Sequence, residues 1–259
     1  MNKIISGLSG IPDRQSKPRT SGLNIMYDHG ISLRELESLF MHAEHIDALE
    51  IGYGPAFLVD DLKERVSLCK AHNITPFLTG FVFEVFKVRD KVNDYISMCK
   101  DINLKTFQVS DTCIQLSHYE KCVYIEKLSK HGTVYTRVGS QDAAHIIPSY
   151  KWIESMNAEV SAGASLVFAE SREAGNVGIY RGGGEVREGL VHEMVQHIPQ
   201  EKIVWDTPHI AQQLYFIELL GGQCNCSRIK PELLLGFEAM RLGLSPRTFY
   251  LFFNKEEKV

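Results

Sequence analysis

Acidic and basic side chains recur directly after the short apolar runs of this 259-residue sequence. If the runs are parallel β-strands, these side chains lie on the loops that lead into the following helices, where the reactive groups of α/β barrels gather. A merely solvated surface would scatter its charges over helix faces instead. The ionisable residues in such positions are Asp28, His29, Glu50, Glu84, Asp111, Arg137, Glu170, Arg172, Glu173, Asp206 and Arg228. We therefore expect one catalytic site at the carboxyl ends of the strands.

Four of these carboxylates are predicted to bind a metal ion. Carboxylates that crowd into one barrel mouth raise each other's pKa unless a cation lies among them. Oxygen-rich sites of this kind suit Mg²⁺ better than zinc. We predict Mg²⁺ as the cofactor, with the ligands Glu84, Asp111, Glu170 and Asp206.

The arginines predict an anionic substrate. Guanidinium groups such as those of Arg137 and Arg172 bind phosphate or carboxylate in a bidentate manner, and backbone N–H groups near residues 229–232 could hold a phosphate where the last helix begins. We expect a small anionic, phosphorylated substrate. The predicted substrate-binding residues are Ser110, Arg172, Glu173, Asn225 and Arg228, and the predicted catalytic residues are Asp28, His29, Glu50 and Arg137.

Eight short apolar runs alternate with eight amphipathic stretches, the pattern of a (β/α)8 TIM-type barrel. The predicted strands are Leu23–Tyr27, Ala48–Ile51, Thr75–Leu78, Thr106–Val109, Val134–Thr136, Leu166–Ala169, Ile203–Trp205 and Gln223–Cys226. The predicted helices are Leu33–Ala43, Leu58–Ala71, Val92–Ile102, Tyr119–Lys130, Tyr150–Ala162, Val186–Ile198, Ile210–Leu220 and Pro231–Leu242. A doubly wound open sheet is the alternative, but no Gly-rich fingerprint follows the first strand. Ser32 and Ser117 are predicted helix N-caps.

The composition of the chain argues against two classes of function, nucleic-acid binding and membrane spanning. A net charge of −4 argues against nucleic-acid binding, and no apolar run approaches the length of a membrane span. Without an export signal, the six cysteines are expected to be reduced thiols of a cytoplasmic protein, and we expect a homo-oligomer. Residues 1–20 are predicted to form a polar arm, residues 21–253 one barrel domain, and residues 254–259 a charged tail.

Two further motifs leave alternatives open. Cys224 and Cys226 favour packing over a reactive thiol or a metal site, because no further thiolate ligands are evident. The run Gly182–Gly184 after Arg181 favours a flexible loop over a phosphate site.

The ordered set of strand-end motifs resembles the phosphosulfolactate synthase family from about residue 19 to 253. The motifs are Tyr27–Gly30, Gly52–Gly54, Phe83–Glu84, Val109–Asp111, Val138–Asp142, Glu170–Gly175, Gly184–Arg187, Asp206–Pro208, Gln212–Gln213, Asn225 and Glu238–Leu244. The resemblance implies a (β/α)8 barrel that adds sulfite to phosphoenolpyruvate with Mg²⁺, giving 2-phospho-3-sulfolactate, in the route to coenzyme M and sulfolactate.

Two positions depart from the resemblance as a pair. The family implies a lysine at the end of the second strand and a glutamate at the end of the fifth, where this chain has Glu50 and Arg137. An arginine stays protonated and cannot replace a proton-delivering lysine. Three interpretations follow: a synthase whose acid is His29 or Glu50, a diverged enzyme with another nucleophile or substrate, and a non-catalytic, stress-related member. We also predict that Glu50 and Arg137 form a salt bridge and that Arg137 contacts the substrate.

Overall fold

Eight parallel strands alternate with helices in the computed structural model, which describes residues 7–253. Hydrogen bonds connect the strands in the order β3-β2-β1-β8-β7-β6-β5-β4, and β3 and β4 lie next to each other at the remaining seam. The strands are β1 (Asn24–Asp28), β2 (Ala48–Ile51), β3 (Thr75–Leu78), β4 (Thr106–Val109), β5 (Thr133–Val138), β6 (Leu166–Ala169), β7 (Ile203–Asp206) and β8 (Asn225–Ile229). This arrangement confirms the predicted (β/α)8 barrel.

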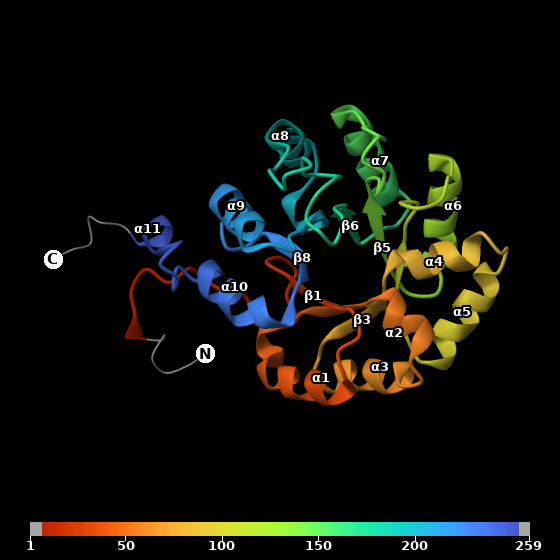
Figure 1. Ribbon diagram of the computed structural model, residues 1–259, viewed down its shortest axis with the longest axis horizontal. Coiled ribbons are helices and arrows are strands. Elements are labelled where there is room, and N and C mark those ends of the chain that lie inside the picture. The colour runs from red at the N-terminus through yellow and green to blue at the C-terminus, as the bar shows by residue number, and fades with distance from the viewer. Residues whose placement is uncertain (1–6, 254–259) are drawn as a thin grey trace.

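The helices surround the strands (Figure 1). They are α1 (Leu33–Leu39), η2 (Phe40–His45), α2 (Tyr53–Leu58), α3 (Leu62–Ala71), α4 (Gly80–Lys87), α5 (Val92–Asp101), α6 (His118–Ser129), α7 (Ser149–Ser161), α8 (Glu188–His197), η3 (Gln200–Lys202), α9 (Ile210–Leu220), η4 (Pro231–Leu233), α10 (Leu234–Arg241) and α11 (Phe249–Phe252). The predicted ends of α9 and of four strands match the structure. Helices α2 and α4 were not predicted.

The predicted bounds of the eighth strand were wrong. It was predicted over Gln223–Cys226, but β8 begins at Asn225 and continues to Ile229. Its pairing with β1 is irregular, and Arg228 has a φ of 55°. The polar residues Ser227 and Arg228 are therefore part of the strand, which an apolar-run criterion ends too early.

Side chains alternate between two buried layers, as the two-residue period of a strand requires. One layer fills the barrel below the mouth and includes Ile25, Phe77, Tyr135 and Phe168. The other layer, with residues such as Val167, packs between strands and helices. Whether a strand-end side chain faces the barrel or the helices is thus decided by its parity along the strand.

The seam between β3 and β4 is closed by side chains instead of a backbone ladder. Gln108 of β4 accepts a hydrogen bond from Gly80 N at 2.7 Å. Glu84 of α4 accepts from the backbone N–H of Thr112 at 3.0 Å and of Cys113 at 2.9 Å, and from the hydroxyl of Ser110. A Cβ at position 80 would lie 2.5 Å from the Ser110 Oγ, so only glycine lets the two strands approach this closely.

Local signals at the chain ends and helix starts agree with this arrangement. Ser32 and Ser117 cap α1 and α6 with their side chains, as predicted. The arm over residues 8–23 contains no helix or strand, and Arg14 ties it to Glu238 of α10 at 2.7 Å. The tail predicted over residues 254–259 lies outside the described residues. None of the helices within residues 7–253 has the length and hydrophobicity that crossing a bilayer demands.

Candidate active site

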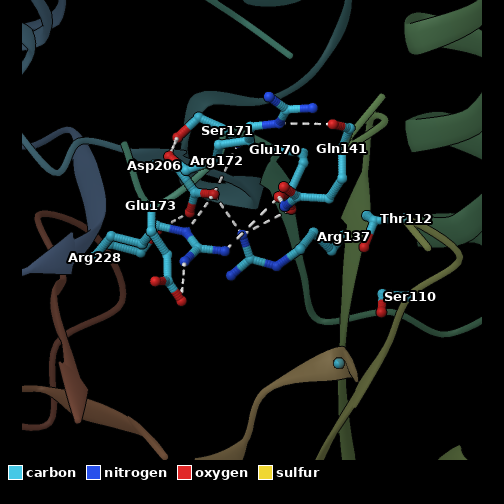
Figure 2. Close-up of polar contacts among 12 residues, drawn as sticks. Ser110, Thr112, Arg137, Gln141, Glu170, Ser171, Arg172, Glu173, Asp206 and Arg228 are labelled. Carbon is cyan, nitrogen blue, oxygen red and sulfur yellow. Dashed lines mark hydrogen bonds and ion pairs between the residues drawn. The ribbon is translucent and has the colours of Figure 1, made fainter. Parts of the chain in front are cut away.

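A buried arginine at the end of β5 is the centre of the barrel mouth (Figure 2). Arg137 Nη2 donates to both carboxylate oxygens of Glu50 at 3.0 Å, and Nη1 donates to Glu170 at 2.9 Å and to Asp206. The guanidinium also lies over the Phe168 ring, 5.1 Å from its centroid. Only 2% of Arg137 is exposed. The predicted Glu50–Arg137 salt bridge is confirmed, and a single nitrogen, Nη2, contacts both carboxylate oxygens.

A second arginine, Arg228 of β8, binds the same carboxylates. Its Nε donates to Asp206 at 3.0 Å, and its terminal nitrogens lie 3.7 Å from Glu170 and from Glu173. Its guanidinium covers the ring of Tyr27 at 5.2 Å, and the Tyr27 hydroxyl donates to Glu173 at 2.8 Å. These contacts connect the neighbouring strands β1 and β8 to Glu173, which follows β6.

Groups around this cluster hold the two central carboxylates in place. Asp206 accepts from Ser171 N at 3.0 Å and from the Ser227 hydroxyl at 2.6 Å. The side-chain amide of Gln141 donates a hydrogen bond to Glu170. The main-chain carbonyl oxygen of Gln141 accepts a hydrogen bond from Arg172 Nε at 2.7 Å. The terminal nitrogens of Arg172 have no hydrogen-bond partner among the described residues, so they remain available to a ligand.

The buried cluster holds an excess of negative charge. Three carboxylates (Glu50, Glu170, Asp206) surround two guanidinium groups (Arg137, Arg228), which leaves one formal negative charge. Burial raises the pKa of Glu170 to about 7 against the opposing pull of the arginines. Burial also acts to raise the pKa of Asp206, but both arginines outweigh it and the pKa is lowered. Environment thus separates two neighbouring carboxyls, the pattern that assigns one of them a proton.

Two of the predicted mouth carboxylates face the helices instead. Asp28 follows the inward-facing Tyr27, and it accepts from Arg65 of α3 at 2.8 Å. Asp111 points toward α6, where Lys121 donates to it at 2.8 Å. Our expectation that they share the central cavity with Glu50 is therefore wrong, and strand parity is the reason.

Glu84, Ser110 and Asn225 serve the barrel frame. The hydrogen bonds of Glu84 close the β3–β4 seam, and one of them comes from the Ser110 hydroxyl. Asn225 begins β8 and bonds to Leu23 N at 3.0 Å, so it lies at the amino-terminal end of the strands, opposite the mouth. Its assignment to the mouth depended on the misplaced eighth strand.

A cavity of about 220 Å³ opens beside the cluster. Its lining residues are Tyr27, His29, Glu173, Pro208, Arg228 and Lys230. We call it the mouth pocket. It brings together the predicted residues His29, Glu173 and Arg228. It adds Lys230, whose ammonium forms no ion pair with a carboxylate of the described residues.

The predicted Mg²⁺ ligands are not gathered around one point. Within residues 7–253 no three His, Cys, Asp or Glu side chains form a group that could hold a metal ion. Mg²⁺ often binds one or two carboxylates and completes its shell with water and substrate phosphate, which the residues present still allow. Asp111 fits that role best, since its side chain is 24% exposed and only one of its oxygens accepts a hydrogen bond.

Sequence reasoning missed three residues that build this site, namely Tyr27, Gln141 and Lys230. Tyr27 and Gln141 stand inside motifs that were recognised, but only the structure shows that they contact Glu173 and Glu170. Alternation along β1 could have identified Tyr27, because it shares the inward parity of Ile25.

Comparisons with known proteins agree with this geometry. Residues 12–246 match the sequence profile of (2R)-phospho-3-sulfolactate synthase (ComA). The chain is 32% identical over 245 residues to the phosphosulfolactate synthase of Bacillus subtilis, covering 93% of this chain and 97% of that one. It is 30% identical over 240 residues to the enzyme of Methanothermobacter thermautotrophicus, covering 90% of this chain and 93% of that one.

Solved structures show the fold alone. The YdjI aldolase of Escherichia coli superposes with a TM-score of 0.56 at 9% identity, covering 87% of this chain and 80% of that one. A 3-hexulose-6-phosphate synthase gives 0.54 at 12% identity, covering 85% and 99%. These likenesses support the barrel, and the sequence matches, which extend over nearly the whole chain, place the protein in the (2R)-phospho-3-sulfolactate synthase family.

Proposed function

We propose that this protein adds a nucleophile, sulfite in the family, to phosphoenolpyruvate and forms 2-phospho-3-sulfolactate. The observation that carries the proposal is a pocket lined by Arg228 and Lys230 at the barrel mouth of a chain whose residues 12–246 match the synthase profile. In the reaction, the sulfur lone pair forms a C–S bond at C3. The C2–C3 π electrons move toward C2 and its carboxylate, and C2 then takes a proton.

The residues of the mouth pocket suit an anion that gains charge during this step. Lys230 and Arg228 line the pocket, and the terminal nitrogens of Arg172 are open to a ligand. Preorganised cations of this kind stabilise a developing enolate-like charge. Mg²⁺, when bound, would neutralise negative charge on the substrate. Asp111 lies outside the mouth pocket, so it would reach such a metal only through water or the substrate phosphate.

His29 is the side chain that we assign to protonate C2. It lines the mouth pocket and is exposed, so it can exchange protons with solvent between turnovers. Glu50, the other residue predicted for this role, is buried and both its oxygens accept hydrogen bonds from Arg137. Arg137 is itself surrounded by carboxylates, and its role here is to keep them in position.

The direct test is an assay of the purified protein with phosphoenolpyruvate, sulfite and Mg²⁺. We expect phosphosulfolactate, detected by ³¹P NMR. Lys230→Met should raise KM by about tenfold or more, because a hydrogen bond to a charged group contributes about 1.5–3 kcal/mol. Lys63→Met on the exposed face of α3 is the matched control. Unchanged kinetics in the Lys230→Met variant would show that the mouth pocket does not bind the substrate.

The metal proposal predicts a stability effect. Mg²⁺ together with phosphoenolpyruvate should raise the melting temperature more than either alone, because a ligand at 100 times its Kd adds about 2.7 kcal/mol. Asp111→Asn should abolish the increment due to Mg²⁺, and Asp101→Asn, exposed at the end of α5, should keep it. An identical melting curve with and without millimolar Mg²⁺, at saturating phosphoenolpyruvate, would argue against a metal.

The second candidate is a diverged enzyme that uses the same pocket with another nucleophile or carboxylate substrate. The Glu50–Arg137 pair favours it, because the strand end where the family implies a proton-delivering lysine holds a carboxylate bound to an arginine. An assay that shows binding of phosphoenolpyruvate but no product with sulfite would select this candidate. Absence of both binding and turnover would leave the non-catalytic interpretation.

A further inference from the structure

A larger cavity lies beside the barrel mouth, between α7 and α8. It measures about 550 Å³, within the range of small-molecule sites and more than twice the mouth pocket. The loops that follow β5 and β6 form its rim, and we call it the lateral cavity. Gly178 and Ser140 belong to its wall, and a Cβ at Gly178 would lie 1.9 Å from the Glu170 carbonyl oxygen. The cavity therefore adjoins the mouth but does not include its arginines.

Two arginines at this cavity carry positive charge that no carboxylate neutralises. Arg181 and Arg187 follow the two residues of an antiparallel bridge, Tyr180 and Val186, and both line the cavity. Arg187 Nη1 donates to the Gly178 carbonyl at 3.0 Å, and neither guanidinium forms an ion pair within residues 7–253. Burial lowers the pKa of Arg187, and the nearby charge of Arg181 lowers it further. Two guanidinium groups that line one cavity without a carboxylate partner favour an anionic ligand there.

The rest of the wall suits the body of an organic molecule. Ile146, Ile147 and Leu190 are apolar, and Trp152 has a buried indole N–H without a hydrogen-bond partner among the described residues. The two acidic residues in the wall, Asp142 and Glu193, are both exposed. Neither pairs with the arginines.

We propose that the lateral cavity is a second binding site, for an organic phosphate whose phosphate group lies between Arg181 and Arg187 and whose apolar or planar body packs on Ile146 and Leu190. The turn Gly182–Gly184 connects the segments that carry the two arginines. Gly184 N donates to the Arg181 carbonyl at 3.0 Å, and Gly184 has a φ of 92°. A molecule in this cavity contacts the β5–α7 loop, which carries Gln141 to the carboxylate of Glu170. The lateral cavity is distinct from the mouth pocket, because the two have no lining residue in common.

Isothermal titration with adenosine monophosphate, and separately with inorganic phosphate, tests the proposal. We expect adenosine monophosphate to bind the wild-type protein more tightly than inorganic phosphate. Arg181→Gln with Arg187→Gln should weaken binding by more than about tenfold, because each charge-assisted hydrogen bond that is lost costs about that factor. Arg34→Gln, exposed on α1, is the matched control and should bind as the wild type.

A second variant keeps the arginines and fills the space. Gly189 lines the cavity on α8, and a Cβ there meets no atom within 4 Å. Gly189→Phe should fold, because glycine is the weaker helix former, and should abolish binding. Binding of adenosine monophosphate that survives both the double-arginine variant and Gly189→Phe would overturn the proposal. Equal affinity for the two probes would also overturn it, since the apolar wall would then contribute nothing.

Discussion

Replacing Arg137 by methionine is expected to lower the free energy of unfolding by about 3–5 kcal/mol. The variant leaves Glu50, Glu170 and Asp206 buried with Arg228 as their only guanidinium partner in the cluster. Removing one partner of a buried ion pair is far more costly than never having had the pair, because the remaining charge stays desolvated. Urea denaturation followed by circular dichroism measures the effect, and Arg34→Gln on the surface should change it little.

The reciprocal exchange tests whether Glu50 and Arg137 act as a unit. Glu50→Lys alone leaves three cations facing two carboxylates, and Arg137→Glu alone leaves one cation facing four. The double variant restores two cations and three carboxylates, so it should be more stable than Arg137→Glu. We expect a coupling free energy of about 1–3 kcal/mol between the two sites. Single-variant effects that simply add would show that the observed 3.0 Å contact carries no energy.

The pH dependence of stability is expected to reveal the carboxyl of Glu170. Its folded pKa of about 7 lies above the unfolded value, so between about pH 4.5 and 7 the folded state holds a proton that the unfolded state has lost. Stability from this group therefore falls as pH rises through that window, by up to about 1.4 kcal/mol for each pH unit. The lowered pKa of Asp206 acts in a separate window, because its contribution is lost only as pH falls below the usual aspartate range.

Comparison with the Glu170→Gln variant isolates the contribution of Glu170 to the pH dependence of stability. The glutamine of the variant cannot ionise. As pH rises from 5 to 7, the unfolding free energy of the wild type should therefore fall relative to that of the variant. Glu126→Gln, on the exposed face of α6, should keep the wild-type slope. Parallel curves for the wild type and Glu170→Gln would mean that Glu170 titrates outside this window.

The barrel itself could be predicted because most of the strands contain a short, mainly apolar run between polar turns. Buried strands of a parallel sheet are covered on both faces, which explains why Ala48–Ile51, Thr75–Leu78 and Leu166–Ala169 were located to the residue. Helix α4 was not predicted because Gly80–Lys87 is itself strongly apolar and directly follows β3. The eighth strand was shifted because Ser227 and Arg228 are polar residues that belong to the strand and whose partners lie on β7.

The sequence by itself determined which residue types stand at the strand ends, and with them the family, the barrel and the Glu50–Arg137 pair. Only the tertiary structure decided which of them meet. Glu50 occupies a strand position whose side chain faces the barrel interior, whereas Asp28 and Asp111 occupy positions whose side chains face the helices. They therefore pair with Arg65 and Lys121 between the barrel and the helices. Side-chain direction depends on register and on how neighbouring strands pack, and neither quantity can be read from charge or spacing along the chain.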